Sequence, residues 1–189
     1  MTGNVIAVFG SSGIAPESEA YRDGVTLGGV LASAGATVAT GGYGGAMEAV
    51  SRGAHDAGGR VIGVTAPGVF PGRAGRNQWV TSEYRTDTIS ERIHTLIDLA
   101  DAFVALPGSL GTATEIMVAW NDVLVAPMSR RPRKPLVVVG TVWSDLVAAL
   151  VTAVEADDTG VIRVGDAAEA GRVIAAQLRS ICINPGQTE

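Results

Sequence analysis

The sequence predicts a single α/β domain in which helices flank a doubly wound parallel sheet. The chain has 189 residues, close to the size of one domain, and 47% of them are apolar, enough to bury a full core. Short apolar runs alternate with stretches of helical periodicity, an order typical of parallel strands joined by crossover helices. Glycine-rich loops follow three of the apolar runs, where such a sheet binds its ligands.

The first half of the chain contains two strand–loop–helix units and then a third strand. Its strands are short apolar runs of the kind that a parallel sheet buries on both faces, and its helices show apolar residues at helical spacing. The expected strands cover residues 5–9, 37–40 and 61–64, and the expected helices 16–34 and 46–57. Residues 66–78 show no periodicity, and a loop of this length in a compact domain is usually functional.

The second half repeats the alternation of strands and helices. The expected strands cover residues 79–84, 102–106, 135–139 and 161–164. The first expected helix of this half begins at 87 or 88 and ends near 100. The other three cover residues 112–124, 144–155 and 167–178. We expect one domain over residues 1–181 and a frayed tail over 182–189.

Composition restricts the class of protein. The net charge is −5 and the thirteen arginines are scattered, which argues against sequence-independent binding of nucleic acid. No apolar stretch reaches the roughly 18 residues that a membrane span requires. Cys182 is the only cysteine, and the N-terminus has no basic leader before its apolar run. We therefore expect a cytoplasmic protein without a membrane or nucleic-acid partner.

The three glycine loops suggest a phosphorylated ligand. They cover residues 10–13, 41–45 and 107–111, and each opens a predicted helix. Free N–H groups and a partial positive charge make a helix N-terminus suitable for phosphate. The alternative is that the loops are simply tight turns between strand and helix. Three such loops together favour a nucleotide or a sugar phosphate.

Familiar fingerprints of other enzyme classes are missing. Met47 occupies the position at which GxGxxG needs its third glycine, and no lysine follows a glycine loop as a P-loop requires. No GxSxG elbow is present, and His55 and His94 lack partners at metal-ligand spacing. A dinucleotide enzyme, a P-loop nucleotidase, a serine hydrolase and a metal site all lose support.

Two charged residues have both a structural and a functional interpretation. Thr112 and Glu115 form T-x-x-E at a predicted helix start, which is the pattern of a capping box. Glu115 would nevertheless lie near the presumed phosphate pocket. Arg92 flanks the apolar stripe of its helix, which by itself favours a solvated arginine with a buried stem.

Several segments together resemble a known family. They are Val8–Ser12, Gly41–Met47, Ala54–Val64, Glu91–Arg92 and Ala100–Glu115, in this order along the chain. The last contains Pro-Gly-Ser-Leu-Gly-Thr-Ala-Thr-Glu, similar to the PGGxGTxxE hallmark of the LONELY GUY family. That family has a Rossmann-like fold and is often mislabelled as lysine decarboxylases. The resemblance covers about residues 4–175, with Ser109 in place of a glycine and Ile93 in place of a lysine.

The resemblance implies a phosphoribohydrolase, which cleaves the N-glycosidic bond of AMP or of a cytokinin riboside 5′-monophosphate. Arg92 and Glu115 would be the catalytic pair. The residues implied to bind the phosphorylated substrate are Gly10, Ser11, Gly42, Gly44, Gly108, Ser109, Leu110, Gly111 and Thr112. No metal and no cofactor is implied. The alternative is a carrier that binds a nucleotide or the molybdenum cofactor without cleaving it, because the superfamily also contains such proteins.

Three further expectations concern chemistry and assembly. A pyridoxal phosphate decarboxylase needs a lysine, and Lys134, the only lysine, lies in a basic run at the amino end of a strand, the wrong edge of the sheet. Ser109 should fit without strain, its Cβ turned away from the phosphate. We also expect a homodimer through the helix that ends near residue 100 and the helix at 112–124. Related proteins dimerise through these two helices, and apolar residues on both extend beyond the stripe that would face the sheet. Those residues are Leu99, Met117, Val118, Trp120 and Val123.

Overall fold

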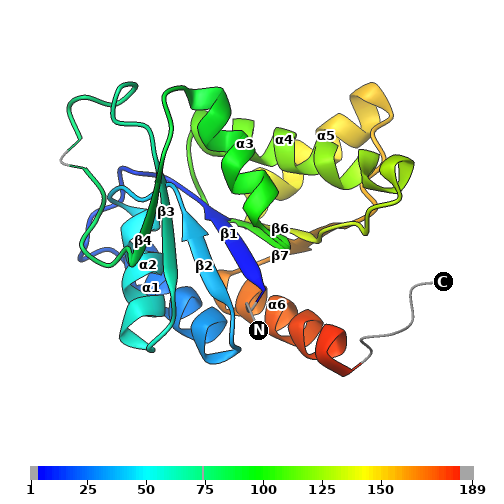
Figure 1. Ribbon diagram of the computed structural model, residues 1–189. Coiled ribbons are helices and arrows are strands. Elements are labelled where there is room, and N and C mark those ends of the chain that lie inside the picture. The colour runs from blue at the N-terminus through cyan, green and yellow to red at the C-terminus, as the bar shows by residue number, and fades with distance from the viewer. Residues whose placement is uncertain (1–3, 74, 184–189) are drawn as a thin grey trace.

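The computed structural model, which describes residues 4–73 and 75–183, contains a seven-stranded parallel sheet with helices on both faces (Figure 1). The strands are β1 (Val5–Phe9), β2 (Thr37–Thr40), β3 (Val61–Thr65), β4 (Ser82–Arg85), β5 (Ala102–Ala105), β6 (Leu136–Val139) and β7 (Val161–Val164). The helices are α1 (Glu19–Ser33), α2 (Ala46–Asp56), α3 (Ile89–Leu99), α4 (Leu110–Val125), α5 (Thr141–Val154) and α6 (Ala167–Ile183), with a short 3₁₀ helix at Ala126–Ser129. The predicted doubly wound, Rossmann-like α/β fold is confirmed.

The strand order places a crevice at the centre of the sheet. The order is β4-β3-β2-β1-β5-β6-β7, so β1 pairs with both β2 and β5. The chain winds outward from β1 to β4 on one side and then returns to β5 on the other. The connections that leave β1 and β5 therefore diverge, and ligands of open α/β sheets bind in the crevice that results.

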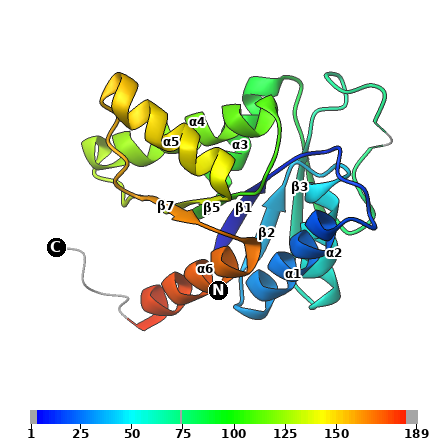
Figure 2. The same ribbon diagram turned by 180° about the vertical axis from the view of Figure 1, so that it is seen from behind.

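Helices cover both faces of the sheet. α1, α2 and α6 lie on one face, and α3, α4 and α5 lie on the other (Figures 1 and 2). Alternate residues of β1 point to opposite faces: Ile6 and Val8 belong to the core under α1, α2 and α6, whereas Ala7 and Phe9 belong to the core under α3, α4 and α5. This two-sided burial explains the continuous apolar runs of the sequence.

Some helix and strand ends differ from the prediction by a few residues. α1 begins at Glu19 rather than residue 16, because Ser18 caps it by accepting a hydrogen bond from the backbone N–H of Tyr21. α4 begins at Leu110, so residues 110–112 are helical and not part of the loop. α5 begins three residues early, and β4 lies at 82–85 rather than 79–84. Residues 66–73 and 75–78 belong to the predicted long loop.

The C-terminal helix is longer than expected. α6 continues to Ile183, so residues 182 and 183 are helical and not part of a frayed tail. The rest of the predicted tail, 184–189, lies outside the described residues. Within the described part of the chain, no helix is both long enough and apolar enough to cross a bilayer.

Candidate active site

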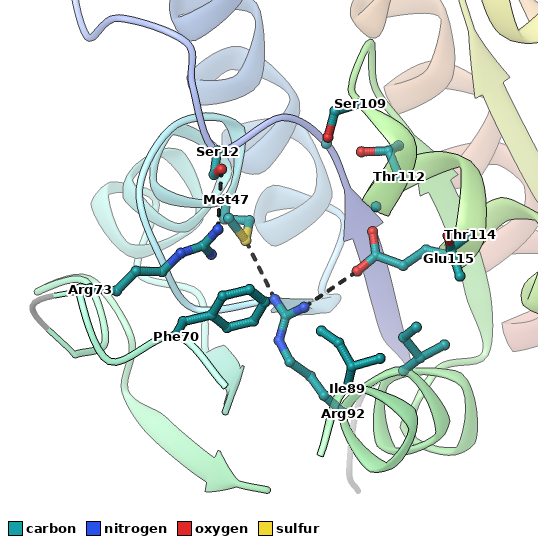
Figure 3. Close-up of a pocket in the computed structure, with 13 residues that line it drawn as sticks. Ser12, Met47, Phe70, Arg73, Ile89, Arg92, Ser109, Thr112, Thr114 and Glu115 are labelled. Atoms are coloured by element: carbon teal, nitrogen blue, oxygen red, sulfur yellow. Dashed lines mark hydrogen bonds and ion pairs between the residues drawn. The ribbon is translucent and has the colours of Figure 1, made fainter. Parts of the chain in front are cut away.

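A pocket of about 300 Å³ lies at the carboxyl edge of the sheet, beside the crevice between β1 and β5 (Figure 3). Residues from both halves of the chain line it: Gly10, Ser12, Met47, Phe70, Arg73, Ile89, Arg92, Ile93, Ser109, Gly111, Thr112, Thr114 and Glu115. Both predicted catalytic residues and four of the predicted binding residues, Gly10, Ser109, Gly111 and Thr112, are therefore brought together.

Arg92 is fixed in the floor of this pocket. Thr88 and Glu91 form a capping box that starts α3, and Arg92 follows in its first turn. Only 6% of Arg92 is exposed. Its Nε donates to the backbone oxygen of Val64 (2.8 Å) and its Nη2 to that of Gly41 (3.1 Å). The alternative of a solvated arginine is therefore wrong.

Gly41 leaves room for the guanidinium group. A Cβ atom at position 41 would lie 1.7 Å from Nη2 of Arg92 and 2.6 Å from the sulfur of Met47. Any other residue would displace one of these side chains. The sequence identified the glycine loop as a ligand site, but it gave no sign that Gly41 serves an arginine on another helix.

Glu115 faces Arg92 from α4. Its Oε1 lies 3.7 Å from Nη1 of Arg92, and both side chains are almost fully buried (Figure 3). Burial raises the pKa of Glu115 to about 7, although the positive charge of Arg92 acts in the opposite direction. Burial likewise lowers the pKa of Arg92, against the attraction of Glu115. Near neutral pH both protonation states of Glu115 are populated, as acid–base chemistry requires.

The capping box predicted for Thr112 and Glu115 is wrong. The N-cap of α4 is Ser109, three residues before Thr112, and it makes no side-chain capping hydrogen bond. Thr112 is the third residue of the helix, and Glu115 is its sixth. The first turn of α4 therefore presents N–H groups without a side-chain cap beside the pocket, a favourable arrangement for an anion.

Ser109 occupies its position without backbone strain. Its φ of −110° and ψ of −167° are extended values that any residue adopts, as expected. The neighbouring Gly108 is the restricted position, because a Cβ there would lie 2.1 Å from Oγ1 of Thr112. Ser109, which replaces a glycine of the hallmark, therefore lies at the position of the loop where a side chain is tolerated.

Five predicted binding residues lie outside the lining of this pocket. They are Ser11, Gly42, Gly44, Gly108 and Leu110. Ser11 joins the glycine loops through its backbone, because its N–H donates to Pro107 and its carbonyl accepts from Ala46. Gly44 lines a neighbouring cavity, and Leu110 is 83% exposed.

Other lining residues were not predicted individually. Phe70 and Arg73 come from the long loop 66–78, and its length was the only signal in the sequence. The guanidinium carbon of Arg73 lies 4.1 Å from the ring centre of Phe70 and 4.6 Å from that of Tyr43. Among the described residues, no group of three or more His, Cys, Asp and Glu side chains could hold a metal ion.

Comparison with curated proteins gives partial matches to named enzymes. A protein of Mycobacterium tuberculosis called cytokinin riboside 5′-monophosphate phosphoribohydrolase is 36% identical over 97 residues, 51% of each chain. A rice protein called probable cytokinin riboside 5′-monophosphate phosphoribohydrolase LOG4 is 37% identical over 82 residues, 42% of this chain and 35% of the rice protein. The matched region spans about half the length of such relatives, or less.

Solved structures match over nearly the whole chain. The molybdenum cofactor binding protein of Rippkaea orientalis superposes with a TM-score of 0.74 at 22% identity, covering 94% of this chain and 99% of that one. The molybdenum cofactor carrier protein of Chlamydomonas reinhardtii gives 0.70 at 25% identity, covering 94% and 98%. The family model described as possible lysine decarboxylase matches residues 47–174, more than half of the chain. With its phosphoribohydrolase relatives, this match shows that the chain belongs to the LOG family.

Proposed function

We propose that the protein is a nucleoside 5′-monophosphate phosphoribohydrolase, which hydrolyses the N-glycosidic bond of AMP or of a cytokinin riboside 5′-monophosphate. The observation that carries this proposal is the buried pair of Arg92 and Glu115 beside the N-terminus of α4. Relatives named for this activity support it.

The phosphate of the substrate binds at the start of α4 in this proposal. Ser109, Gly111 and Thr112 line the pocket there, and the backbone N–H groups of the first turn supply donors. The ribose then extends toward Glu115, which lies one turn further along the same helix.

Glu115 stabilises the transition state. As the bond between C1′ and the base nitrogen breaks, its electron pair leaves with the base and positive charge develops on the ribose. A carboxylate beside C1′ stabilises this charge and orients a water molecule. The water oxygen bonds to C1′; one of its protons stays on the new hydroxyl group and the other goes to the base. The products are free base and ribose 5-phosphate.

Arg92 positions the carboxylate and keeps its ionised form accessible. Its backbone partners at Gly41 and Val64 fix the guanidinium group, and the charge of that group opposes the effect of burial on Glu115. Without Arg92, Glu115 would be protonated over more of the neutral range.

Incubation with AMP and with isopentenyladenosine monophosphate, followed by chromatography of the free base, tests the activity. The wild type should release base, and Glu115→Gln should lose about a hundredfold or more in rate. The exposed Glu17 offers the matched control Glu17→Gln, which should keep full activity. Full turnover by Glu115→Gln would remove Glu115 from the mechanism.

A second candidate is a carrier that binds a phosphorylated ligand without cleaving it. The similarity to molybdenum cofactor binding proteins over 94% of the chain favours it. A carrier would bind nucleotide or cofactor at the same helix N-terminus but release no base. The incubation above therefore separates the two candidates.

A further inference from the structure

A second cavity adjoins the candidate active site. It measures about 350 Å³ and shares two residues, Ser12 and Arg73, with the pocket described above. Tyr43, Gly44 and Glu48 also line it. A ligand that extends past Arg73 would therefore enter a space large enough for a further ring system.

The loop that carries Arg73 is fastened to the second glycine loop at both ends. The backbone N–H of Ala66 donates to the hydroxyl group of Tyr43 (2.8 Å), and that of Asn77 donates to the carbonyl of Gly42 (2.7 Å). Asn77 Nδ2 also donates to the carbonyl of Tyr43 (3.0 Å). These contacts hold Arg73 against Tyr43 and Phe70, opposite Ser109 and Thr112 (Figure 3).

The charge of Arg73 has no carboxylate partner within 4 Å among the described residues, unlike that of Arg92. Its side chain donates a long hydrogen bond, from Nη2 to Oγ of Ser12 (3.4 Å). A guanidinium group offers five N–H donors in a planar fork. Most of the donors of Arg73 therefore remain available to a ligand between the two cavities.

We propose that Arg73 contacts the base of the substrate and that the preferred base is a 6-oxopurine, guanine above all. This inference rests on the proposed function, because phosphate at α4 and C1′ beside Glu115 direct the base toward Arg73. Guanine presents two acceptors, N7 and O6, which match the guanidinium fork. Adenine presents N7 beside an amino group, so one donor of Arg73 would face another donor.

Glu48 supplies a complementary acceptor in the second cavity. Its Oε1 accepts a hydrogen bond from the Tyr21 hydroxyl (3.2 Å), and no described residue donates to its Oε2. The N1–H and 2-amino groups of guanine are donors suited to such a carboxylate. Hypoxanthine lacks the 2-amino group, and adenine lacks both donors. The expected order of preference is GMP, then IMP, then AMP and its N6-substituted forms.

Comparison of kcat/KM for GMP, IMP, AMP and isopentenyladenosine monophosphate tests this proposal. GMP should exceed AMP by roughly tenfold to a hundredfold, the range expected for one bidentate contact. Arg73→Ala should reduce the values for GMP and IMP to that for AMP, and Arg73→Lys should restore only part of the difference. Arg60→Ala, at the opposite edge of the sheet, is the matched control and should change nothing.

Two outcomes would overturn the assignment. One is a wild type that prefers AMP or does not discriminate between bases. The other is an equal loss for all four substrates in Arg73→Ala, which would place Arg73 on the phosphate instead. If no nucleotide releases base, the hydrolase proposal fails, and calorimetric binding of GMP and AMP still tests the base contact. Tighter binding of GMP that depends on Arg73 would support it, whereas equal affinities would refute it.

Discussion

Glu115 is a deeply buried carboxyl group, and its burial raises the pKa to about 7. Desolvation alone favours the neutral acid, and Arg92 at 3.7 Å limits the shift without abolishing it. Such a group can exist in either protonation state at neutral pH. It is therefore suited to bind an uncharged ribose and then to stabilise the cation that forms from it.

The raised pKa of Glu115 predicts how stability depends on pH. The group titrates near 4.5 in the unfolded chain and near 7 in the folded protein. Its stabilising contribution is therefore complete below about pH 4.5 and is lost as the pH rises through 7. Glu115→Gln should flatten this decline of the unfolding free energy, which urea denaturation at pH values from about 5 to 8 measures. Glu17→Gln should retain the wild-type slope, and equal slopes in all three proteins would contradict the prediction.

Ser109 should be replaceable by glycine at little cost. Its extended backbone stores no strain, and glycine at an N-cap usually changes stability by only a few tenths of a kcal/mol. We expect Ser109→Gly to leave thermal unfolding nearly unchanged and to alter phosphate-ligand affinity by less than about tenfold. Strong base release by the variant and none by the wild type would show that serine disables the site, and would favour the carrier candidate.

Lys134 is not placed to form a Schiff base with pyridoxal phosphate. Its Nζ donates to the carbonyl of Ile97 (2.8 Å) and lies 3.7 Å from Asp122, just before the amino end of β6. The candidate site lies at the opposite edge of the sheet. We expect the protein mixed with pyridoxal phosphate to show no Schiff-base absorbance attributable to Lys134. A band that disappears in Lys134→Ala would contradict this.

At the scale of elements, the residue pattern predicted those structural features that depend only on residues close together in the sequence. The apolar run of β1 sufficed to predict a two-sided buried strand, because that burial requires only a continuous run. The burial of Arg92 could not be predicted from its helix, since its partners at Val64 and Gly41 are 28 and 51 residues away. The capping box at Thr112 failed because Ser109 starts α4 three residues earlier.

The contact between the end of β2 and α3 gives a test of this long-range dependence. Gly41→Ala should displace the guanidinium group of Arg92, because the new Cβ would overlap Nη2. The overlapped atoms are the ends of flexible side chains, so the loss of stability should be only about 1–3 kcal/mol. Base release should nevertheless fall by about a hundredfold or more, the loss that we also expect for Arg92→Ala.

A matched substitution in another loop controls for the added methyl group. Gly68 has an ordinary φ, and an added Cβ there would meet no atom within 4 Å, so Gly68→Ala should keep both stability and activity. Chemical denaturation and the base-release assay measure the two effects separately. An active Gly41→Ala protein would mean that Arg92 does not need its contact with the carbonyl of residue 41.

At the scale of the whole molecule, the face formed by α3, α4 and α5 carries exposed apolar side chains. Leu110 is 83% exposed, Val118 38%, Ile89 40% and Val142 68%. Trp120 and Val123 do not contribute to this surface, contrary to our expectation, because they are buried between α4 and the sheet. α4 is therefore apolar on two sides, and the sheet covers only one of them.

This second apolar side predicts a homodimer through α4. Leu110, Met117 and Val118 recur at helical spacing, and exposed apolar patches commonly mark protein interfaces. Light scattering at micromolar concentration should give twice the chain mass of 19.3 kDa. Val118→Glu should yield monomers, because it would bury a charge in the interface. Val154→Glu, at the exposed end of α5, should remain dimeric. A monomeric wild type would leave the outer side of α4 without a partner copy, and the apolar residues there would need another explanation.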